Sequence, residues 1–477
     1  QTLGANFERS VARFGDREAL VDVATNRRWT YNELDVEIDE AALGLLEMGI
    51  GKGDRVGIWA LNCAEWVIIQ YATAKIGAIL VNVNPAYRAH ELRYVIEQSG
   101  MRLLVSATTY RNSDYRAMVE QVRPDCPELT EVVYIGEESW NRLMERGSRS
   151  DHQRLEAQAA TLSFDDAINI QYTSGTTGFP KGATLSHHNI LNNGYFVTAR
   201  IGFTEKDRLA IPVPMYHCFG MVMGVIGSFS HGAAVIFPSP SFDPAATLSA
   251  VQAERATALY GVPTMFIAEL GLPTFAEFDL TSLRTGIMAG SPCPVEVMKR
   301  VVADMHMSQV AIAYGMTETS PVSTMTRMDD DLDRRTSTVG TVMPHVEVKI
   351  VDPAQLSASE LAVEQRGRPS TAILRRIQAP SCTFFRSTRE NSGAPPAVRA
   401  GALRRNLLDL AVGKLDGRRT AEDWNDDLHL LTIGLHFFDR SREVGEGTRH
   451  HAHLITDVES YSLHSGRQRI IGYLLRD

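Results

Sequence analysis

The sequence predicts an α/β protein with more than one domain. Its 477 residues exceed the size at which a single hydrophobic core stops growing, so two or more domains are expected. Segments with helical and strand periodicity alternate along the first part of the chain, as they do in α/β domains. Several strand-like segments end directly in glycines and hydroxyl residues, which is where α/β proteins hold their ligands.

Composition and charge exclude several classes of function. The chain is 44% hydrophobic and 22% charged with a net charge of −9, which is typical of a globular protein and gives no support for a nucleic-acid surface. Five cysteines stand singly, which favours a reducing, cytoplasmic location. The apolar stretch 215–229 is too short to span a bilayer and favours a buried helix. Peripheral membrane contact and homo-oligomerisation stay open.

The first part of the chain predicts a scaffold. Thr30 precedes Glu33 by three residues, the spacing of a capping box, and a helical run follows. We expect a strand over 55–59, a helix over 64–76 and a second strand over 77–82. The polar segment 124–160 is expected to be a surface connection.

A glycine-rich and hydroxyl-rich loop follows the strand predicted over 166–172. Residues 171–184 read QYTSGTTGFPKGAT. Glycines allow the backbone N–H groups to approach a phosphate, hydroxyls add donors, and Lys181 adds a positive charge. By composition alone the stretch is equally compatible with a surface loop. A kinase-type P-loop is not supported, because Pro180-Lys181-Gly182 stands where that motif requires Gly-Lys-Ser/Thr.

Histidines follow this loop at two places. Ser186 is expected to cap a helix that begins with His187 and His188; a metal site there lacks a third ligand at a useful spacing. Pro214, His217 and Gly220 follow a later strand, with Met215, Met221 and Met223 around them. A histidine beside apolar residues is commonly a satisfied core residue, and methionines commonly fill a core or a pliable apolar cavity.

Two later segments repeat the form of a strand followed by glycine. The first, 283–292, has Gly290 and Ser291 near its end. The second, 313–320, reads AYGMTETS. A lone carboxylate such as Glu318 suits Mg²⁺, which takes one or two carboxylates together with phosphate oxygens.

The loop at 171–184 and the segment at 313–320, in this order, resemble the signatures of the acyl-adenylate-forming (AMP-binding) superfamily. The resemblance extends over about residues 1–352 and is strongest to the medium-chain fatty acyl-CoA synthetases. It implies a three-layer α/β adenylate-forming fold with two pseudo-equivalent α/β subdomains and a smaller β region. It also implies ATP and Mg²⁺ as cofactors, coenzyme A as co-substrate, and small molecules rather than nucleic acid as partners.

The same resemblance implies roles for individual residues. In the family the matching Tyr stacks on adenine, the Thr contacts the phosphates, the Glu binds Mg²⁺, and the His gates the acyl tunnel. The implied catalytic residues are Thr173, Lys181, His217, Thr317 and Glu318, with Thr173 and Glu318 also at the metal. The implied nucleotide-binding residues are Ser174, Gly175, Thr176, Thr177, Gly178, Gly290, Ser291, Tyr314 and Gly315.

The implied reaction converts a medium- or long-chain fatty acid to acyl-AMP and then to acyl-CoA. Alternatives are a fatty acyl-AMP ligase, an aryl-CoA ligase, a luciferase-like oxygenase, or an inactive protein that binds nucleotide or acyl chains. His217 and the methionines favour an aliphatic chain.

Residues 353–477 do not match the family. The expected Gly-Glu-Leu, Thr-Gly-Asp and catalytic-lysine motifs are not readable, and Lys414 is the only lysine of this tail. Arginine becomes denser while lysine nearly vanishes, which is compatible with a frameshift, a fusion or a divergent tail. We therefore expect an adenylation domain over 1–352 and an atypical, partly disordered tail that impairs activity.

Overall fold

A six-stranded, mostly parallel sheet forms the first half of the structure. The fold is a computed structural model that describes residues 1–173, 180–348 and 468–469, all within one compact unit of the chain. The strand order is β10-β9-β4-β3-β5-β8, and only β10 runs antiparallel to its neighbour. The strands are β3 (Arg55–Trp59), β4 (Ile79–Asn82), β5 (Met101–Ser106), β8 (Glu131–Tyr134), β9 (Ala167–Thr173) and β10 (Lys181–Ser186).

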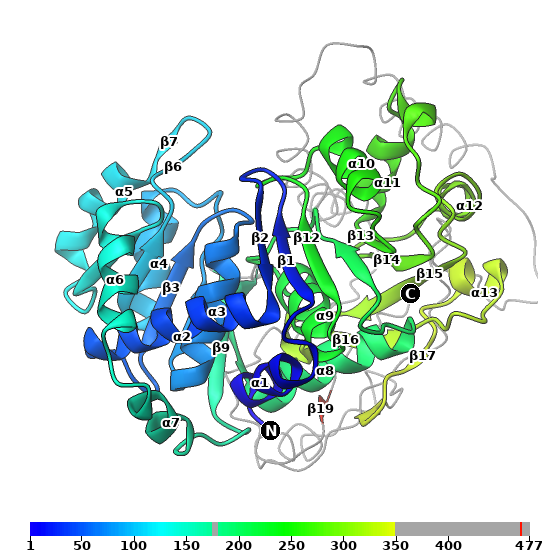
Figure 1. Ribbon diagram of the computed structural model, residues 1–477. Helices are drawn as coiled ribbons and strands as arrows, with labels where there is room; N and C mark the ends of the chain where they lie inside the picture. Colours follow the sequence, from blue (N-terminus) through cyan, green and yellow to red (C-terminus); the bar gives the residue numbers. More distant parts are fainter. Residues whose placement is uncertain (174–179, 349–467, 470–477) are drawn as a thin grey trace, which may run out of the picture. The chain divides into compact units, whose positions relative to one another are not determined.

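A nine-stranded sheet has the order β17-β16-β15-β14-β13-β11-β12-β1-β2. The last two strands in this order, β1 and β2, come from the start of the chain. β1 pairs in parallel with β12, with Leu20 opposite Val235, and Figure 1 shows blue β1 beside green β12. The strands are β1 (Glu18–Asp22), β2 (Arg27–Thr30), β11 (Arg208–Ala210), β12 (Ala234–Phe237), β13 (Ala258–Gly261), β14 (Thr285–Ala289), β15 (Gln309–Gly315), β16 (Val322–Met325) and β17 (Thr341–Val342). Two short pairs are separate, β6 (Thr109–Tyr110) with β7 (Ser113–Asp114) and β18 (Val346–Glu347) with β19 (Gln468–Arg469).

Helices cover both faces of each sheet, and one layer of helices is shared. One core joins the six-stranded sheet to α4 (Ala89–Ser99) and α5 (Tyr115–Val122). A second joins the nine-stranded sheet to α10 (Pro244–Ala253), α11 (Pro263–Leu270) and α12 (Val295–Asp304). The largest core contains both sheets together with α1 (Leu3–Phe14), α2 (Tyr31–Glu47), α3 (Ala64–Ile76), α6 (Glu138–Ser148), α7 (Gln153–Ala159), α8 (His187–Arg200), η2 (Phe219–Ile226) and α9 (Gly227–Ser230). Shorter helices are η1 (Arg123–Asp125), η3 (Phe275–Glu277), η4 (Thr317–Thr319) and α13 (Leu332–Ser337).

These layers confirm the predicted α/β architecture with two sheet-based subdomains. The Thr30 hydroxyl and the Glu33 carboxylate form the predicted capping box of α2, and α3 has the predicted bounds, 64–76. Ser186 caps α8 as expected. The predicted smaller β region and the tail after residue 352 lie almost wholly outside the described residues. None of the described helices is long and apolar enough to cross a bilayer.

Two segments differ from the prediction. The segment 124–160 is not a mere connection, because it contains β8, α6 and α7. Helix α6 buries Trp140, Leu143 and Gly147, which stand at the i, i+3 and i+7 spacing of one helix face, a pattern that the prediction missed. In the apolar stretch 215–229, residues 218–229 are buried as expected whereas His217 is exposed, and the helix begins at Phe219 and is a π-helix up to Ile226.

Candidate active site

The base of the predicted phosphate loop is a pair of residues at the edge of the six-stranded sheet. Thr173 ends β9 directly opposite Lys181, the first residue of β10, because the apolar run before Thr173 pairs with the strand after Pro180. The Tyr94 hydroxyl on α4 donates to the Pro180 carbonyl at 3.1 Å. Ser174, Gly175, Thr176, Thr177 and Gly178, for which the sequence predicted nucleotide binding, lie outside the described residues.

Thr317 and Glu318 lie in η4, the short helix that follows β15. Glu318 contacts the base of the predicted phosphate loop. The Thr173 hydroxyl donates to Glu318 Oε1 at 3.3 Å, across 145 residues of sequence. Glu318 is exposed and Thr317 is buried. The turn between them and the strand requires glycine at position 315, since a Cβ there would lie 1.9 Å from the Pro321 carbonyl oxygen.

Gly290, Ser291 and Tyr314 lie along the same edge of the nine-stranded sheet. β14 and β15 are neighbours, and Ala289 pairs with Ala313, so Gly290 and Tyr314 follow paired residues. Gly290 has a φ of +91°, which favours glycine. Tyr314 is half-buried, and burial raises its pKa. A planar ring beside an open backbone turn is suited to hold a flat base.

His217 lies in the loop between β11 and η2. Its Nδ1 accepts a hydrogen bond from the Phe219 N–H at 3.2 Å, so the neutral ring carries its hydrogen on Nε2. Solvent reaches the side chain, yet surrounding protein atoms desolvate the ring and lower its pKa. The ring is therefore not the satisfied core histidine that was the alternative interpretation; it presents a neutral N–H donor.

Cys218 connects the His217 loop to Thr317. Its Sγ lies 3.5 Å from His217 Nδ1 and 3.9 Å from Thr317 Oγ1, within hydrogen-bond reach for sulfur. The thiol is buried, and burial raises its pKa to about 12. Cys218 is therefore an uncharged spacer between two candidate site residues, and no sequence pattern indicates this role.

The residues at the Thr173–Glu318 contact fit a magnesium ion. Mg²⁺ keeps several waters and takes few protein ligands beside substrate phosphates, so one exposed carboxylate with an adjacent hydroxyl is a suitable set. Among the residues that the structure describes, no three His, Cys, Asp or Glu side chains gather as a metal site. His187 is fully buried, and its Nδ1 accepts the Leu3 N–H at 3.0 Å.

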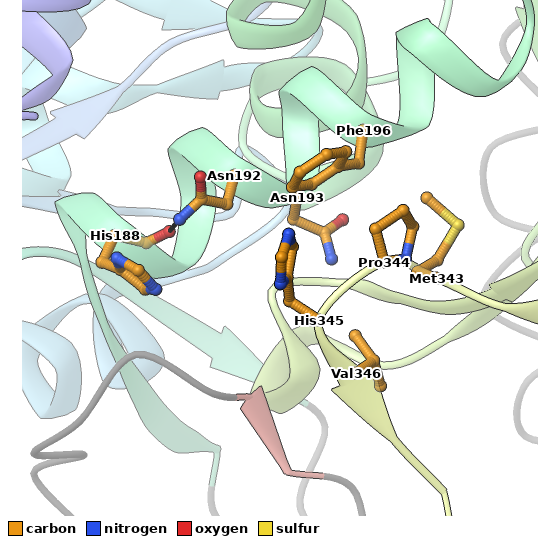
Figure 2. Close-up of a pocket in the computed structure, with 8 residues that line it drawn as sticks. All are labelled: His188, Asn192, Asn193, Phe196, Met343, Pro344, His345 and Val346. Atoms are coloured by element: carbon orange, nitrogen blue, oxygen red, sulfur yellow. Dashed lines mark hydrogen bonds between the residues drawn. The ribbon is translucent and has the colours of Figure 1, made fainter.

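A cavity of about 270 Å³ lies away from these residues, between α8 and the segment before β18 (Figure 2). His188, Asn192, Asn193 and Phe196 line it from α8, and residues 343–346 line the other side. The rings of Phe196 and His345 are 5.3 Å apart. None of the predicted site residues that the structure describes lines this cavity, so it is not assigned to the candidate active site.

Comparison with known proteins adds a family match. The model of a family described as AMP-binding enzyme matches residues 7–367. The putative acyl-CoA synthetase YngI of Bacillus subtilis (strain 168) is 46% identical over 371 residues, covering 74% of this chain and 67% of that protein. The mitochondrial medium-chain acyl-CoA ligase ACSF2 of Danio rerio is 42% identical over 372 residues, covering 74% of this chain and 61% of that protein.

Solved structures show the same fold. The crystal structure of the N-terminal domain of FACL13 from Mycobacterium tuberculosis, with an inhibitor bound, has a TM-score of 0.65 and is 25% identical. It covers 75% of this chain and 86% of that domain. The chain thus matches 61–67% of the length of these curated relatives and most of a domain that was crystallised by itself.

Proposed function

We propose that this chain, which belongs to the AMP-binding enzyme family, activates a medium- or long-chain fatty acid with ATP. The acid is converted to acyl-AMP and then to acyl-CoA. The observation that carries the proposal is the contact between Thr173 and Glu318. It joins the strand before the phosphate loop to the carboxylate expected to bind Mg²⁺. The Cys218–Thr317 contact links the loop that carries His217 to the segment that carries Glu318.

In the first step a carboxylate oxygen of the fatty acid attacks the α-phosphorus of ATP, and the bond to pyrophosphate breaks. The products are acyl-AMP and pyrophosphate. The main task of the protein is to hold two anions together and to stabilise the charge on the phosphates. We assign that task to Lys181 and to the loop at 174–178. Thr173 and Glu318 would hold Mg²⁺, which neutralises phosphate charge when bound.

The remaining residues position the two substrates. Tyr314, with Gly290, Ser291 and Gly315 around it, is proposed to hold the adenine and ribose side of ATP, and Thr317 the phosphates. The Nε2–H of His217 is proposed to donate to the fatty carboxylate, because Nδ1 is already occupied by the Phe219 N–H.

An aliphatic substrate is supported by three methionines close to His217 in the sequence. Met215, Met221 and Met223 are buried in the largest core, which the two sheets share, and methionine adapts to a flexible chain. A panel of acids of graded length, with ATP–pyrophosphate exchange as readout, tests this assignment. Medium and long chains should outperform benzoates, and the reverse order would replace the fatty acid by an aryl acid.

The second step, displacement of AMP by the thiol of coenzyme A, is proposed to be the weaker one. The sequence after about residue 352 lacks the family's Thr-Gly-Asp and lysine motifs. Loss of one charged contact to a phosphate costs about 3–4 kcal/mol, which leaves slow adenylation. Loss of the groups that orient the thiol costs as much as about 7–11 kcal/mol, so almost no acyl-CoA is expected.

The experiment measures both products in one reaction of the purified chain with octanoate, ATP, Mg²⁺ and coenzyme A. Octanoate-dependent ATP–pyrophosphate exchange supports the first step. ATP binding without exchange would leave only a binding function. Acyl-CoA turnover on the order of 1–10³ per second would show that the second step is intact.

The proposed partners are small molecules, namely fatty acid, ATP and coenzyme A. The proposed location is the cytoplasm, on the singly placed cysteines of the sequence alone. Cell fractionation with an antibody to the chain tests the location, and recovery with a membrane or an organelle would contradict it.

A further inference from the structure

Three amide side chains form a buried row on one face of the six-stranded sheet. Gln171 and Asn169 belong to β9 and Asn82 ends β4; their exposed fractions are 2%, 1% and 2%. The two strands pair in parallel, with Asn169 opposite Leu80 and Gln171 opposite Asn82. Because side chains on a strand alternate between faces, all three amides point to the same side.

The amides donate to one another in a single direction. Gln171 Nε2 donates to Asn169 Oδ1 at 2.8 Å, and Asn169 Nδ2 donates to Asn82 Oδ1 at 2.9 Å. Asn82 Nδ2 then donates to the Tyr216 carbonyl oxygen at 3.0 Å. The chain of hydrogen bonds therefore runs from β9 to the loop that carries His217.

A thioether closes the row from the opposite side. Met221 Sδ, on the π-helix η2, lies 3.1 Å from Asn82 Nδ2 and 3.4 Å from Gln171 Nε2. A buried amide hydrogen without an acceptor is costly, so such a row has one satisfied arrangement and resists displacement. The side chains thereby hold η2 and the residues before it at a set distance from β9.

Both ends of the row lie next to candidate site residues. Gln171 precedes Thr173 by two residues, and Tyr216 directly precedes His217. We infer that Asn82 is a positioning residue for adenylation: through the Gln171–Asn169–Asn82 row it sets the place of the His217 ring relative to Thr173. This inference rests on the proposed function, in which His217 orients the fatty carboxylate and Thr173 borders the phosphates.

An activity test compares Asn82→Ala with a matched buried amide far from the site. Asn6 on α1 is 3% exposed, and its Oδ1 accepts from the Ser230 hydroxyl at 3.1 Å. Both variants lose a buried amide, so both should melt at a lower temperature. Only Asn82→Ala should lower kcat for octanoate-dependent exchange, by about 10- to 100-fold, because a displacement of about 1 Å has that effect. The KM for ATP should change by less than about twofold, since uniform binding is untouched.

A second readout does not require activity. In the wild-type chain the ¹⁵N spectrum of labelled histidine should show His217 as the Nε2–H tautomer, assigned with His217→Asn. In Asn82→Ala the Phe219 N–H to Nδ1 bond should be lost and the single tautomer with it, whereas Asn6→Ala should keep it. Met221→Leu, a change that cores tolerate, replaces Asn82→Ala as the test variant if Asn82→Ala does not fold. Met221→Leu should lower kcat by about threefold, because the sulfur that it removes is only a weak acceptor.

The outcomes separate this inference from the proposed function. Absence of exchange in the wild-type chain contradicts the function, while the histidine spectrum still decides the inference. An unchanged His217 signal in both Asn82→Ala and Met221→Leu overturns it. An equal loss of kcat in Asn6→Ala and Asn82→Ala also overturns it, because the effect would then be a general loss of packing.

Discussion

His187 and His217 use the same ring nitrogen in the same way but belong to different regions. In each, Nδ1 accepts a backbone N–H, from Leu3 at 3.0 Å and from Phe219 at 3.2 Å. His187 is fully buried, and burial lowers its pKa to about 4. Solvent reaches His217. Burial of the second ring nitrogen, and not residue type or bonding, therefore separates a scaffold histidine from one that a substrate can reach.

Two lysines show the same contrast. The side chain of Lys75 on α3 is 2% exposed. Its Nζ lies 2.7 Å from Asp35 Oδ1 and 2.5 Å from Asp39 Oδ1. Burial would lower the pKa of Lys75, but the two carboxylates outweigh burial and raise it. Lys181 is half-buried beside the phosphate loop. The scaffold encloses its charge, whereas the candidate site keeps its charge where a ligand can reach it.

The largest effect is expected from Lys75→Met. The change leaves two carboxylates of α2 without their buried cation, so the free energy of unfolding should fall by about 3–5 kcal/mol. Urea denaturation at neutral pH measures it. The control, Lys299→Met, removes an exposed pair with Glu296 and should cost less than about 1 kcal/mol. Equal losses of unfolding free energy in the two variants would show that the buried charge of Lys75 contributes no more than an exposed one.

Lys181→Met should act on the reaction more than on stability. Losing one charge directed at the phosphates should slow ATP–pyrophosphate exchange by about 100- to 1000-fold, or about 3–4 kcal/mol. The urea midpoint should fall far less than it does in Lys75→Met. Lys299→Met is again the control and should exchange normally. A normal exchange rate in Lys181→Met would remove this residue from the site.

Acid should weaken the fold through His187. Burial holds its pKa at about 4 in the folded protein, against about 6.5 in an unfolded chain. As the pH falls, the unfolded chain binds the proton first. The contribution is therefore complete above pH 6.5 and is lost between about pH 6.5 and 4, by about 3 kcal/mol in all.

Unfolding measured against pH tests this sign. His187→Asn should flatten that part of the profile, because asparagine offers an oxygen to the Leu3 N–H and does not titrate. His188→Asn, the neighbouring variant, should keep the wild-type slope. A slope that persists in His187→Asn would show that the acid sensitivity arises elsewhere.

The smallest effect tests a feature that the two regions share. Thr30→Ala and Ser186→Ala each remove the side-chain oxygen of a capping box, at α2 in the scaffold and at α8 beside the site. Each should lower the free energy of unfolding by about 1 kcal/mol. Thermal denaturation compares them with the cap-preserving Thr30→Ser and Ser186→Thr. A loss above about 2 kcal/mol at Ser186 alone would show that α8 is strained where α2 is not.

Residues close together in the sequence were sufficient to predict the local elements. The capping box at Thr30, the helix over 64–76 and the strand that runs into Thr173 depend on residues within one or two turns, and all three are present. The prediction of a surface connection over 124–160 was wrong although a local signal exists, since Trp140, Leu143 and Gly147 repeat at helical spacing. What the sequence does not show is that this face packs on α2. The site roles of Lys181, His217, Glu318 and the others stay predictions.

Which of these groups meet depends on the tertiary structure alone. Cys218 lies within reach of Thr317 because both follow parallel strands of the nine-stranded sheet, whose carboxyl ends lie at one edge. Thr173 ends a strand of the six-stranded sheet, so its contact with Glu318 across 145 residues depends on how the two sheets pack on the helices that they share. Likewise, no spacing in the sequence distinguishes Asn82 from an ordinary strand residue. Its role depends on a neighbour strand and a helix that reach it only after folding, and hydrogen-bond partners over such separations are chosen by packing rather than by residue order.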